Sequence, residues 1–196
     1  MAATCRLPAT GQTTCWNSSG TVIPCAGTGH DGDTLKGAPL AYVDNGDGTI
    51  TDVNTGLQWE KQSSDGSVHD MSNTYTWDQA FSGHVATLNT MSFAGHTDWR
   101  VPNVRELQSI VNYQNSNPAV SPAFNTSCTP SCTMLTCSCT VSNGTYWSSS
   151  SIASSPTNAG GSWRYGARND TIGANSRRTD EAAARSASAS SRVSVR

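Results

Sequence analysis

Apolar and polar residues alternate over residues 41–61, and two turn sequences divide this stretch. The apolar positions include Tyr42, Ile50 and Trp59, and they flank Gly-Asp-Gly and Asn-Thr-Gly. Alternation with a period of two, interrupted by glycine turns, is typical of antiparallel strands. We therefore expect a β-hairpin followed by another strand.

From Thr76 the apolar residues recur every three or four positions instead. This spacing predicts an amphipathic helix with Thr76 as its N-cap and an end near 94–95, and its apolar face would hold Trp77, Ala80, Phe81, Val85, Leu88 and Met91. A second helix is expected to begin at Pro102 or Asn103 and to stop within 115–118, with an apolar face made of Val104, Leu107, Ile110 and Val111.

The other segments are less regular. Residues 1–38 show no hydrophobic period, so we divide the chain into an N-terminal arm linked by disulfides (1–38) and one domain (39–196). Strands are expected around Tyr146 and in Gly-Gly-Ser-Trp at 160–163. Beyond these, large apolar residues are almost absent until Val193, a composition usual for disorder. The alternative is a long surface loop system anchored by the 160–163 strand and a closing strand at 192–196.

Composition limits the class of protein. Only 13% of residues are charged, so small polar side chains must cover much of the surface, which favours loops and short strands. Residues 164–196 hold seven Arg against three acidic residues, which fits either a docking face for an acidic partner or a solvated surface. The Arg residues are diluted by Ala and Ser, and nucleic-acid motifs are lacking, so nucleic acid is not expected as a partner. No run of 18 apolar residues is present, so no membrane span is expected.

Seven cysteines occur in two groups, Cys5, Cys15 and Cys25 near the start and then Cys128, Cys132, Cys137 and Cys139. Such clusters indicate disulfides and an oxidising compartment, so the chain is expected to be secreted or displayed at the cell surface. A zinc site is the alternative for the second group, but its CxxxC and CxC spacings differ from paired CxxC knuckles. The odd number leaves at least one thiol free or paired between chains.

Candidate metal and catalytic residues lack a supporting pattern. Asp44, Asn45 and Asp47 could offer oxygen ligands to calcium, but Val43 and Asn54 occupy two EF-hand ligand positions, so we interpret this stretch as a hairpin turn. The four histidines, His30, His69, His84 and His96, lie outside known hydrolase motifs. Glu60 and Glu106 have no glycosidase context either. We expect no catalytic residue, no metal and no cofactor, and no enzymatic activity.

Several aromatic and charged residues are better explained by structure than by function. His84 and His96 are expected to be structural. Asp98, Trp99 and Arg100 are interpreted as a helix connection held by a buried Arg–carboxylate pair. Four tryptophans fall on apolar faces and are expected in the core, namely Trp59, Trp77, Trp99 and Trp147, whereas Trp163 is ambiguous.

Four motifs, in order, resemble a bacterial family named for the C-terminal domain of a collagen-like adhesin. They are DNGDGTITDVNTGLQWEK, TWDQAF, DWRVPNVRELQSIV and YWSSS, and together they cover about 41–150. The resemblance implies an exported protein of α+β class with a C-type-lectin-like fold, in which two helices pack on short antiparallel strands among long irregular loops. A calcium-dependent, carbohydrate-binding lectin or adhesin is one functional alternative, although the Glu-Pro-Asn or Gln-Pro-Asp triplet of such lectins is missing. A structural surface domain is another.

The end of the chain is similar to the formylglycine-generating-enzyme branch of that fold, through GGSW at 160–163. Ser190-Ser191-Arg192-Val193 stands where that branch closes in Gly-Phe-Arg-Val, and the chain has no Cys after Cys139 to supply its chemistry. Many proteins with such an end are variable proteins of diversity-generating retroelements, whose Asn codons are rewritten at adenines. An AAC codon rewritten in this way cannot encode Met, Gln, Lys, Glu or Trp. Residues 164–196 contain one of these types, Glu181, where the 20 in residues 1–163 predict about four.

We therefore expect a ligand-binding protein with a variable region at about 160–196. Its partner would be a protein or cell-surface ligand, and the oligomeric state is not determined by the sequence. Tyr and Arg offer large contact areas and directional hydrogen bonds, as in other binding surfaces. The candidate ligand-binding residues are Arg164, Tyr165, Arg168, Asn169, Asp170, Thr171, Asn175, Arg177, Arg178, Asp180 and Glu181.

Overall fold

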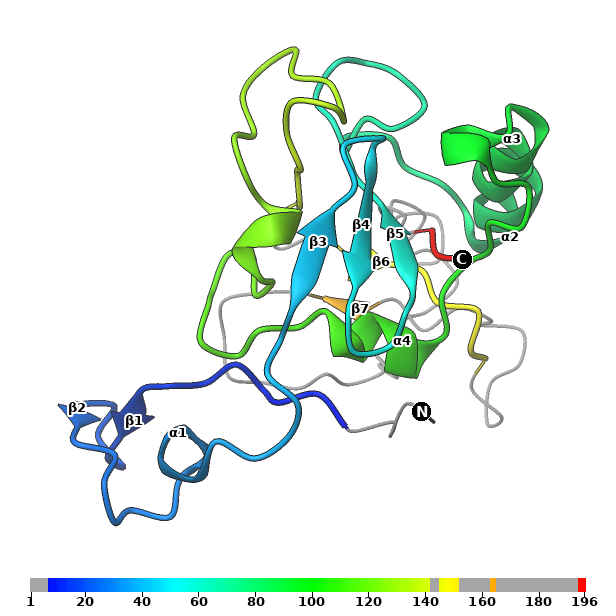
Figure 1. Ribbon diagram of the computed structural model, residues 1–196. Helices are drawn as coiled ribbons and strands as arrows, with labels where there is room; N and C mark the ends of the chain where they lie inside the picture. The colour runs from blue at the N-terminus through cyan, green and yellow to red at the C-terminus, as the bar shows by residue number, and fades with distance from the viewer. Residues whose placement is uncertain (1–6, 142–144, 152–162, 165–193) are drawn as a thin grey trace, which may run out of the picture.

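The computed structural model describes residues 7–141, 145–151, 163–164 and 194–196, and Figure 1 shows how its elements are arranged. In chain order they are β1 (Cys15–Trp16), β2 (Val22–Ile23), α1 (Asp31–Thr34), β3 (Tyr42–Asp44), β4 (Thr49–Asp52), β5 (Gln58–Glu60), α2 (Trp77–Gln79), the π-helix η1 (Ala80–Val85), α3 (Ala86–Thr90), the 3-10 helix η2 (Phe93–Gly95), α4 (Val104–Ser109), the 3-10 helix η3 (Pro122–Phe124), β6 (Thr145–Tyr146) and β7 (Trp163–Arg164). The mixed α+β class with short antiparallel strands is confirmed, and the C-type-lectin-like fold stays a prediction.

The central sheet has the order β3-β4-β5, and both of its strand pairs are antiparallel. Ile50 of β4 lies directly opposite Trp59 of β5, and both side chains are fully buried. The turn between β3 and β4 is closed by its own carboxylates, since Asp44 Oδ1 accepts the Gly46 N–H at 2.9 Å and Asp47 Oδ1 accepts the Thr49 N–H at 3.0 Å. The predicted hairpin and the strand that follows it are therefore confirmed.

The first predicted helix begins as expected but is not one regular α-helix. Thr76 is its N-cap and forms a capping box with Gln79. The central turns are π-helical, with the Ala86 N–H reaching Phe81 O, and regular α-helix ends at Thr90. A π segment rotates the residues that follow it relative to a continuous α-helix. Leu88 is buried within α3, whereas Met91, which we predicted on the apolar face, is exposed because it is the C-cap that follows the last helical residue.

The second helix, α4, is shorter than predicted. Asn103 caps it as expected, accepting the N–H groups of Arg105 and Glu106, but the helix ends at Ser109 with Ile110 as C-cap. The next residues leave the helix because they pair with a later segment. Val111 forms an antiparallel bridge with Val120, and the Asn112 N–H donates to Ala119 O at 3.0 Å. The predicted end at 115–118 was therefore wrong.

The arm docks on the domain by polar contacts. The Cys15–Cys25 disulfide and the β1–β2 pair join its turns. The Gln114 side chain accepts the backbone N–H groups of Thr13 and Thr14 at 2.7 and 2.9 Å. Figure 1 places β1, β2 and α1 at one end of the molecule, away from α2 and α3.

Two clusters of buried side chains form the core. The first joins the sheet to α4 and the segments that follow, and it contains Ile50, Trp59, Leu107, Ile110, Val111, Val120, Phe124, Tyr146 and Val195. The second lies under the π-helical region, and it contains Ala80, Val85, Leu88, Phe93, Trp99 and Val101. Trp59 and Trp99 are in the core, as predicted. Trp77 and Trp147, also expected in the core, are only half-buried, and their indole N–H groups donate to Ser148 O and Tyr75 O.

An ion pair in front of α4 predicts a pH dependence of stability. Burial opposes ionisation of Glu106, but hydrogen bonds from Arg100 and from the Asn103 backbone N–H outweigh it, so the pKa of Glu106 is lowered. A carboxyl with a lowered folded-state pKa stabilises the fold fully above its unfolded-state pKa, and this contribution is lost as pH falls through the folded-state value.

Glu106→Gln keeps the hydrogen bond to the N-cap but removes the charge. We expect a cost of less than about 1 kcal/mol at neutral pH and a shallower loss of unfolding free energy below about pH 4.5. Urea unfolding measured across this pH range checks the prediction. Parallel curves for the variant and the natural chain would contradict it.

Candidate ligand-binding surface

The structure describes both ends of the segment that holds the predicted ligand-binding residues. Arg164 lies in β7, where its backbone pairs with Thr145 of β6. The other ten lie outside the described residues, namely Tyr165, Arg168, Asn169, Asp170, Thr171, Asn175, Arg177, Arg178, Asp180 and Glu181. The structure therefore gives no position for these ten side chains, but it shows how the chain enters the segment and how it returns.

The chain returns as an added strand at the edge of the central sheet. The Glu60 N–H donates to Ser194 O at 3.1 Å, and Gln58 and Arg196 exchange two backbone hydrogen bonds of 3.0 Å each. On its other side, Val195 exchanges two bonds with Arg100, at 2.9 and 3.0 Å. Residues 194–196 therefore lie between β5 and the segment around Arg100, and Figure 1 shows the C-terminus beside β5. The closing strand was expected at 192–196, and its described part, 194–196, is confirmed.

Side chains reinforce this anchor. Val195 is 0% exposed and belongs to the first core cluster. The Arg196 guanidinium donates to Asp98 Oδ1 at 3.0 Å and to Gln58 Oε1 at 2.9 Å. The hydrogen bond from Arg196 lowers the pKa of Asp98. The last residue of the chain is therefore held by both backbone and side-chain contacts.

These contacts correct our interpretation of Asp98, Trp99 and Arg100. The Arg100 guanidinium forms a two-bond pair with Glu106, at 2.8 and 2.6 Å, and its side chain is about half exposed. Asp98 is exposed and pairs with Arg196 instead. No buried Arg–carboxylate pair therefore holds this connection. Only Trp99 is buried as expected, and its indole N–H donates to Phe93 O at 3.0 Å.

The chain enters the segment that holds the predicted ligand-binding residues through β7, which pairs with β6. Tyr146 is almost fully buried, and its hydroxyl accepts the Val141 N–H at 3.0 Å. Burial raises the pKa of Tyr146 well above its ordinary value, so the phenol stays protonated. β7 pairs with this strand through Tyr146 opposite Trp163. The predicted strands around 146 and 163 are confirmed, and both are short.

A buried acid–base cluster lies next to residues 194–196, the C-terminal anchor. The Glu60 carboxylate accepts from His69 Nδ1 and from His84 Nε2, both at 2.7 Å, and all three side chains are at most 3% exposed. The backbone N–H of the same Glu60 bonds Ser194. The structural role predicted for His84 agrees with this geometry. Our sequence reasoning did not find the cluster, because His69 and His84 lie 9 and 24 positions after Glu60 and form no local motif with it.

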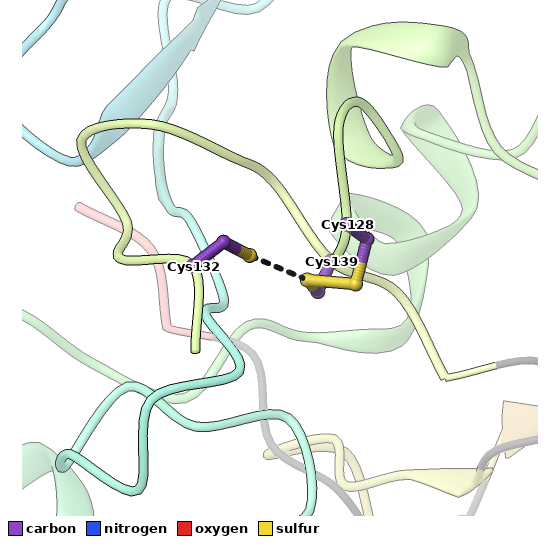
Figure 2. Close-up of side chains that lie close together, drawn as sticks. All are labelled: Cys128, Cys132 and Cys139. Carbon is purple, nitrogen blue, oxygen red and sulfur yellow. Dashed lines mark hydrogen bonds between the residues drawn. A yellow bond between two sulfur atoms is a disulfide. The ribbon is translucent and has the colours of Figure 1, made fainter. Parts of the chain in front are cut away.

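The second cysteine group forms two nested disulfides, Cys128–Cys139 and Cys132–Cys137. Figure 2 shows Cys128 joined to Cys139, with the Cys132 sulfur close by. The prediction of disulfides in both cysteine groups is confirmed, and Cys5, the seventh cysteine, lies outside the described residues. The loop is therefore cross-linked twice within twelve residues.

The oxygen-rich turn of the hairpin is engaged by the protein itself. Lys61 donates to Asp44 Oδ2 at 2.6 Å, and Asp47 Oδ1 accepts from both the backbone and the side chain of Thr49. Burial opposes ionisation of Asp44, but the hydrogen bonds from Lys61 and Gly46 outweigh it and lower the pKa. These contacts favour the turn interpretation over a calcium loop.

A groove of about 490 Å³ separates the arm from the domain. Pro39, Leu40 and Tyr42 form part of its apolar lining, and Asp31 and Lys36 add charges. Sequence reasoning missed this groove, because its two walls come from segments about 100 residues apart. No local pattern could have indicated that they meet.

The described residues thus define a disulfide-linked α+β domain, in which β7 pairs with β6 and residues 194–196 join the central sheet. Among these residues no helix is long and apolar enough to cross a membrane. A family model described as the Lcl C-terminal domain matches residues 48–187, and the chain belongs to this family. Comparison with curated proteins and with solved structures gave no match. The matched region includes the predicted ligand-binding residues and excludes the whole arm, 1–38.

Proposed function

We propose that this chain is a surface-displayed or secreted binding module, and that residues 164–181 form its recognition surface for a protein or cell-surface ligand. The observation that carries the proposal is the insertion of residues 194–196 between β5 and Arg100, together with β7 on β6. The chain is therefore hydrogen-bonded to the core on both sides of the recognition segment, at β7 and at residues 194–196. A binding segment held at both ends on a rigid support loses less conformational entropy when a ligand binds.

The support beneath the segment suits display outside the cell. Three disulfides cross-link the arm and the 128–139 loop. Disulfides of this density are usual in secreted and surface proteins. Membership of the Lcl C-terminal domain family supports an adhesin-like, surface role.

The proposal includes binding without catalysis. The acid–base cluster formed by Glu60, His69 and His84 is sealed from solvent, so a substrate could not reach its carboxylate. The seven Arg against three acidic residues in 164–196 favour acidic patches on the partner, and the Ala and Ser content of this stretch argues against nucleic acid.

We further propose that a retroelement diversifies the surface residues of this segment. The scarcity of residue types that AAC-derived codons cannot encode supports this part of the proposal. The neighbouring DNA tests it. We expect a reverse transcriptase gene and a near-copy of the final hundred or so bases of the coding sequence, and absence of both would refute diversification while leaving the binding proposal open to its own test.

The binding proposal predicts that the recognition segment tolerates substitution. In the full chain, all eleven predicted ligand-binding positions are randomised together, and the displayed variants are sorted for protease resistance and then for binding to two immobilised probes, lysozyme and ovalbumin. We expect most variants to remain resistant, and selected variants to bind one probe and not the other. A library randomised at the buried positions Ile50, Leu88 and Leu107 is the matched control, and most of its members should be degraded.

A single variant complements the library. Replacing Arg164, Tyr165, Arg177 and Arg178 with Ala should shift the melting temperature by less than about 3 °C, because the proposal requires these side chains to face solvent, where side chains contribute little to stability. If this variant unfolds, or if most library members lose protease resistance, residues 164–181 belong to the core and the proposal fails.

A further inference from the structure

The four cysteines of the 128–139 loop place their sulfur atoms in one cluster. Cys139 Sγ lies 3.8 Å from Cys132 Sγ and 3.8 Å from Cys137 Sγ, although neither is its disulfide partner. The sulfurs of Cys128, Cys132 and Cys139 all lie within 4.8 Å of one another. Figure 2 shows the Cys132 sulfur pointing toward the Cys128–Cys139 disulfide.

These separations match the edges of a zinc tetrathiolate. A Zn–S bond of about 2.3 Å in a tetrahedral site places neighbouring sulfurs about 3.8 Å apart. A tetrahedral site has six sulfur–sulfur distances. Two of them, Cys132–Cys139 and Cys137–Cys139, therefore have this length already. The two disulfide-bonded pairs would open to the same separation after reduction. Cys137 lies outside the group of sulfurs within 4.8 Å of one another, so its side chain would also have to rotate toward Cys128.

The backbone holds the cysteines together independently of the disulfides. The Cys139 N–H donates to Gln62 O at 2.9 Å, and Cys132 O accepts the Ser64 N–H at 2.9 Å. Thr126 and Ser138 exchange two further bonds, at 2.8 and 2.9 Å, next to the outer disulfide. Reduction removes the cross-links but leaves these hydrogen bonds, so the four thiols stay close together. A site of this kind loses less entropy on metal binding than an open loop does.

We propose that Cys128, Cys132, Cys137 and Cys139, once both disulfides are reduced, bind one Zn²⁺ as a tetrathiolate. Reduction of the two disulfides takes four electrons and four protons and yields four thiols. A dithiol supplies both and becomes a disulfide, whereas a phosphine supplies the electrons, becomes a phosphine oxide, and takes the oxygen and the protons from water. Zinc binding then releases up to four protons as the thiols become thiolates. Reoxidation of the sulfurs to two disulfides removes the ligands and releases the ion.

Exposure of the cluster sets the order of reduction. Cys128 is exposed, whereas Cys137 and Cys139 are buried. A thiolate reductant that attacks Cys128 forms a mixed disulfide there and frees Cys139 as the leaving thiolate. That thiolate lies 3.8 Å from both sulfurs of the inner disulfide, so it can attack the inner disulfide in turn.

The experiment uses the full chain with Cys5, Cys15 and Cys25 replaced by Ser, so that only the four proposed ligands remain. After phosphine reduction under inert gas, the protein is titrated with Co²⁺ and then with Zn²⁺. We expect one equivalent of Co²⁺ to give the charge-transfer and ligand-field absorption of a tetrahedral thiolate complex, and one equivalent of Zn²⁺ to displace it. Zinc should also protect four thiols from alkylation. The oxidised protein should bind neither ion.

Two variants test the ligand set. Cys137→Ser should weaken zinc binding by more than about tenfold, since even outer-shell changes commonly cost that much. Met71→Leu removes the thioether 3.8 Å from Cys128 Sγ and should leave zinc affinity unchanged. If reduction unfolds the chain, one equivalent of Zn²⁺ should restore its near-ultraviolet circular dichroism. Binding without thiolate absorption, a stoichiometry other than one, or equal affinity for Cys137→Ser would overturn the proposal.

Discussion

Replacing Val195 with Asp is expected to cost more than about 4 kcal/mol of unfolding free energy, a large part of the total stability of a domain of this size. Val195 is 0% exposed, lies in the first core cluster and bridges both Trp59 and Arg100. A carboxylate at this position would be buried without a partner, and the added strand would separate from the sheet. Thermal and urea unfolding of the purified variant measure the loss.

Val53→Asp is the matched control, because Val53 is 56% exposed and lies close to the end of β4. We expect it to change stability by less than about 1 kcal/mol. If Val195→Asp is as stable as the control, the C-terminal strand does not support the fold. The proposal that the recognition segment is held on a rigid base would then fail.

The second large effect is expected at the buried acid–base cluster. Glu60→Ala removes the common partner of His69 and His84 and leaves two buried imidazoles without their carboxylate. Breaking a buried pair by removing one partner typically costs about 3–5 kcal/mol. We expect a loss of this size in urea unfolding near neutral pH.

Arg100→Ala provides the comparison, since it breaks an ion pair whose Arg side chain is about half exposed. Its cost should stay below about 1 kcal/mol. Similar losses of unfolding free energy for Glu60→Ala and Arg100→Ala would contradict the expected contribution of the cluster to stability. Because a larger loss of stability makes opening of the sheet edge that holds residues 194–196 more frequent, the C-terminal strand should also be easier to cleave by carboxypeptidase in the Glu60 variant than in the Arg100 variant.

The elements that sequence reasoning located correctly are those determined by local contacts. Thr76 and Asn103 were recognised as N-caps because capping depends on groups within three residues. The hairpin was recognised because glycine turns and alternating residues determine which strands pair. Disulfides were expected from the spacing of the cysteines and are confirmed.

The errors have long-range causes. Sequence periodicity extended α4 beyond Ile110, but pairing of Val111 with Val120 ends it earlier. Periodicity also could not reveal the π segment, or that α3 ends at Thr90 and leaves Met91 exposed as its C-cap. For Arg100 we expected a buried carboxylate partner, whereas its partner Glu106 lies at the start of the next helix and leaves the guanidinium half exposed.

The amino-acid sequence by itself determined the α+β class, the caps, the turns, the cross-linked cysteine groups and the family-like motifs, because each depends on residues that are near neighbours in the chain. Tertiary structure alone decided that residues 194–196 join the central sheet and that Glu60 joins His69 to His84. Such contacts join residues whose separation along the chain carries no local signal. They form because a buried strand edge or a buried charge must find a partner wherever the fold brings one near.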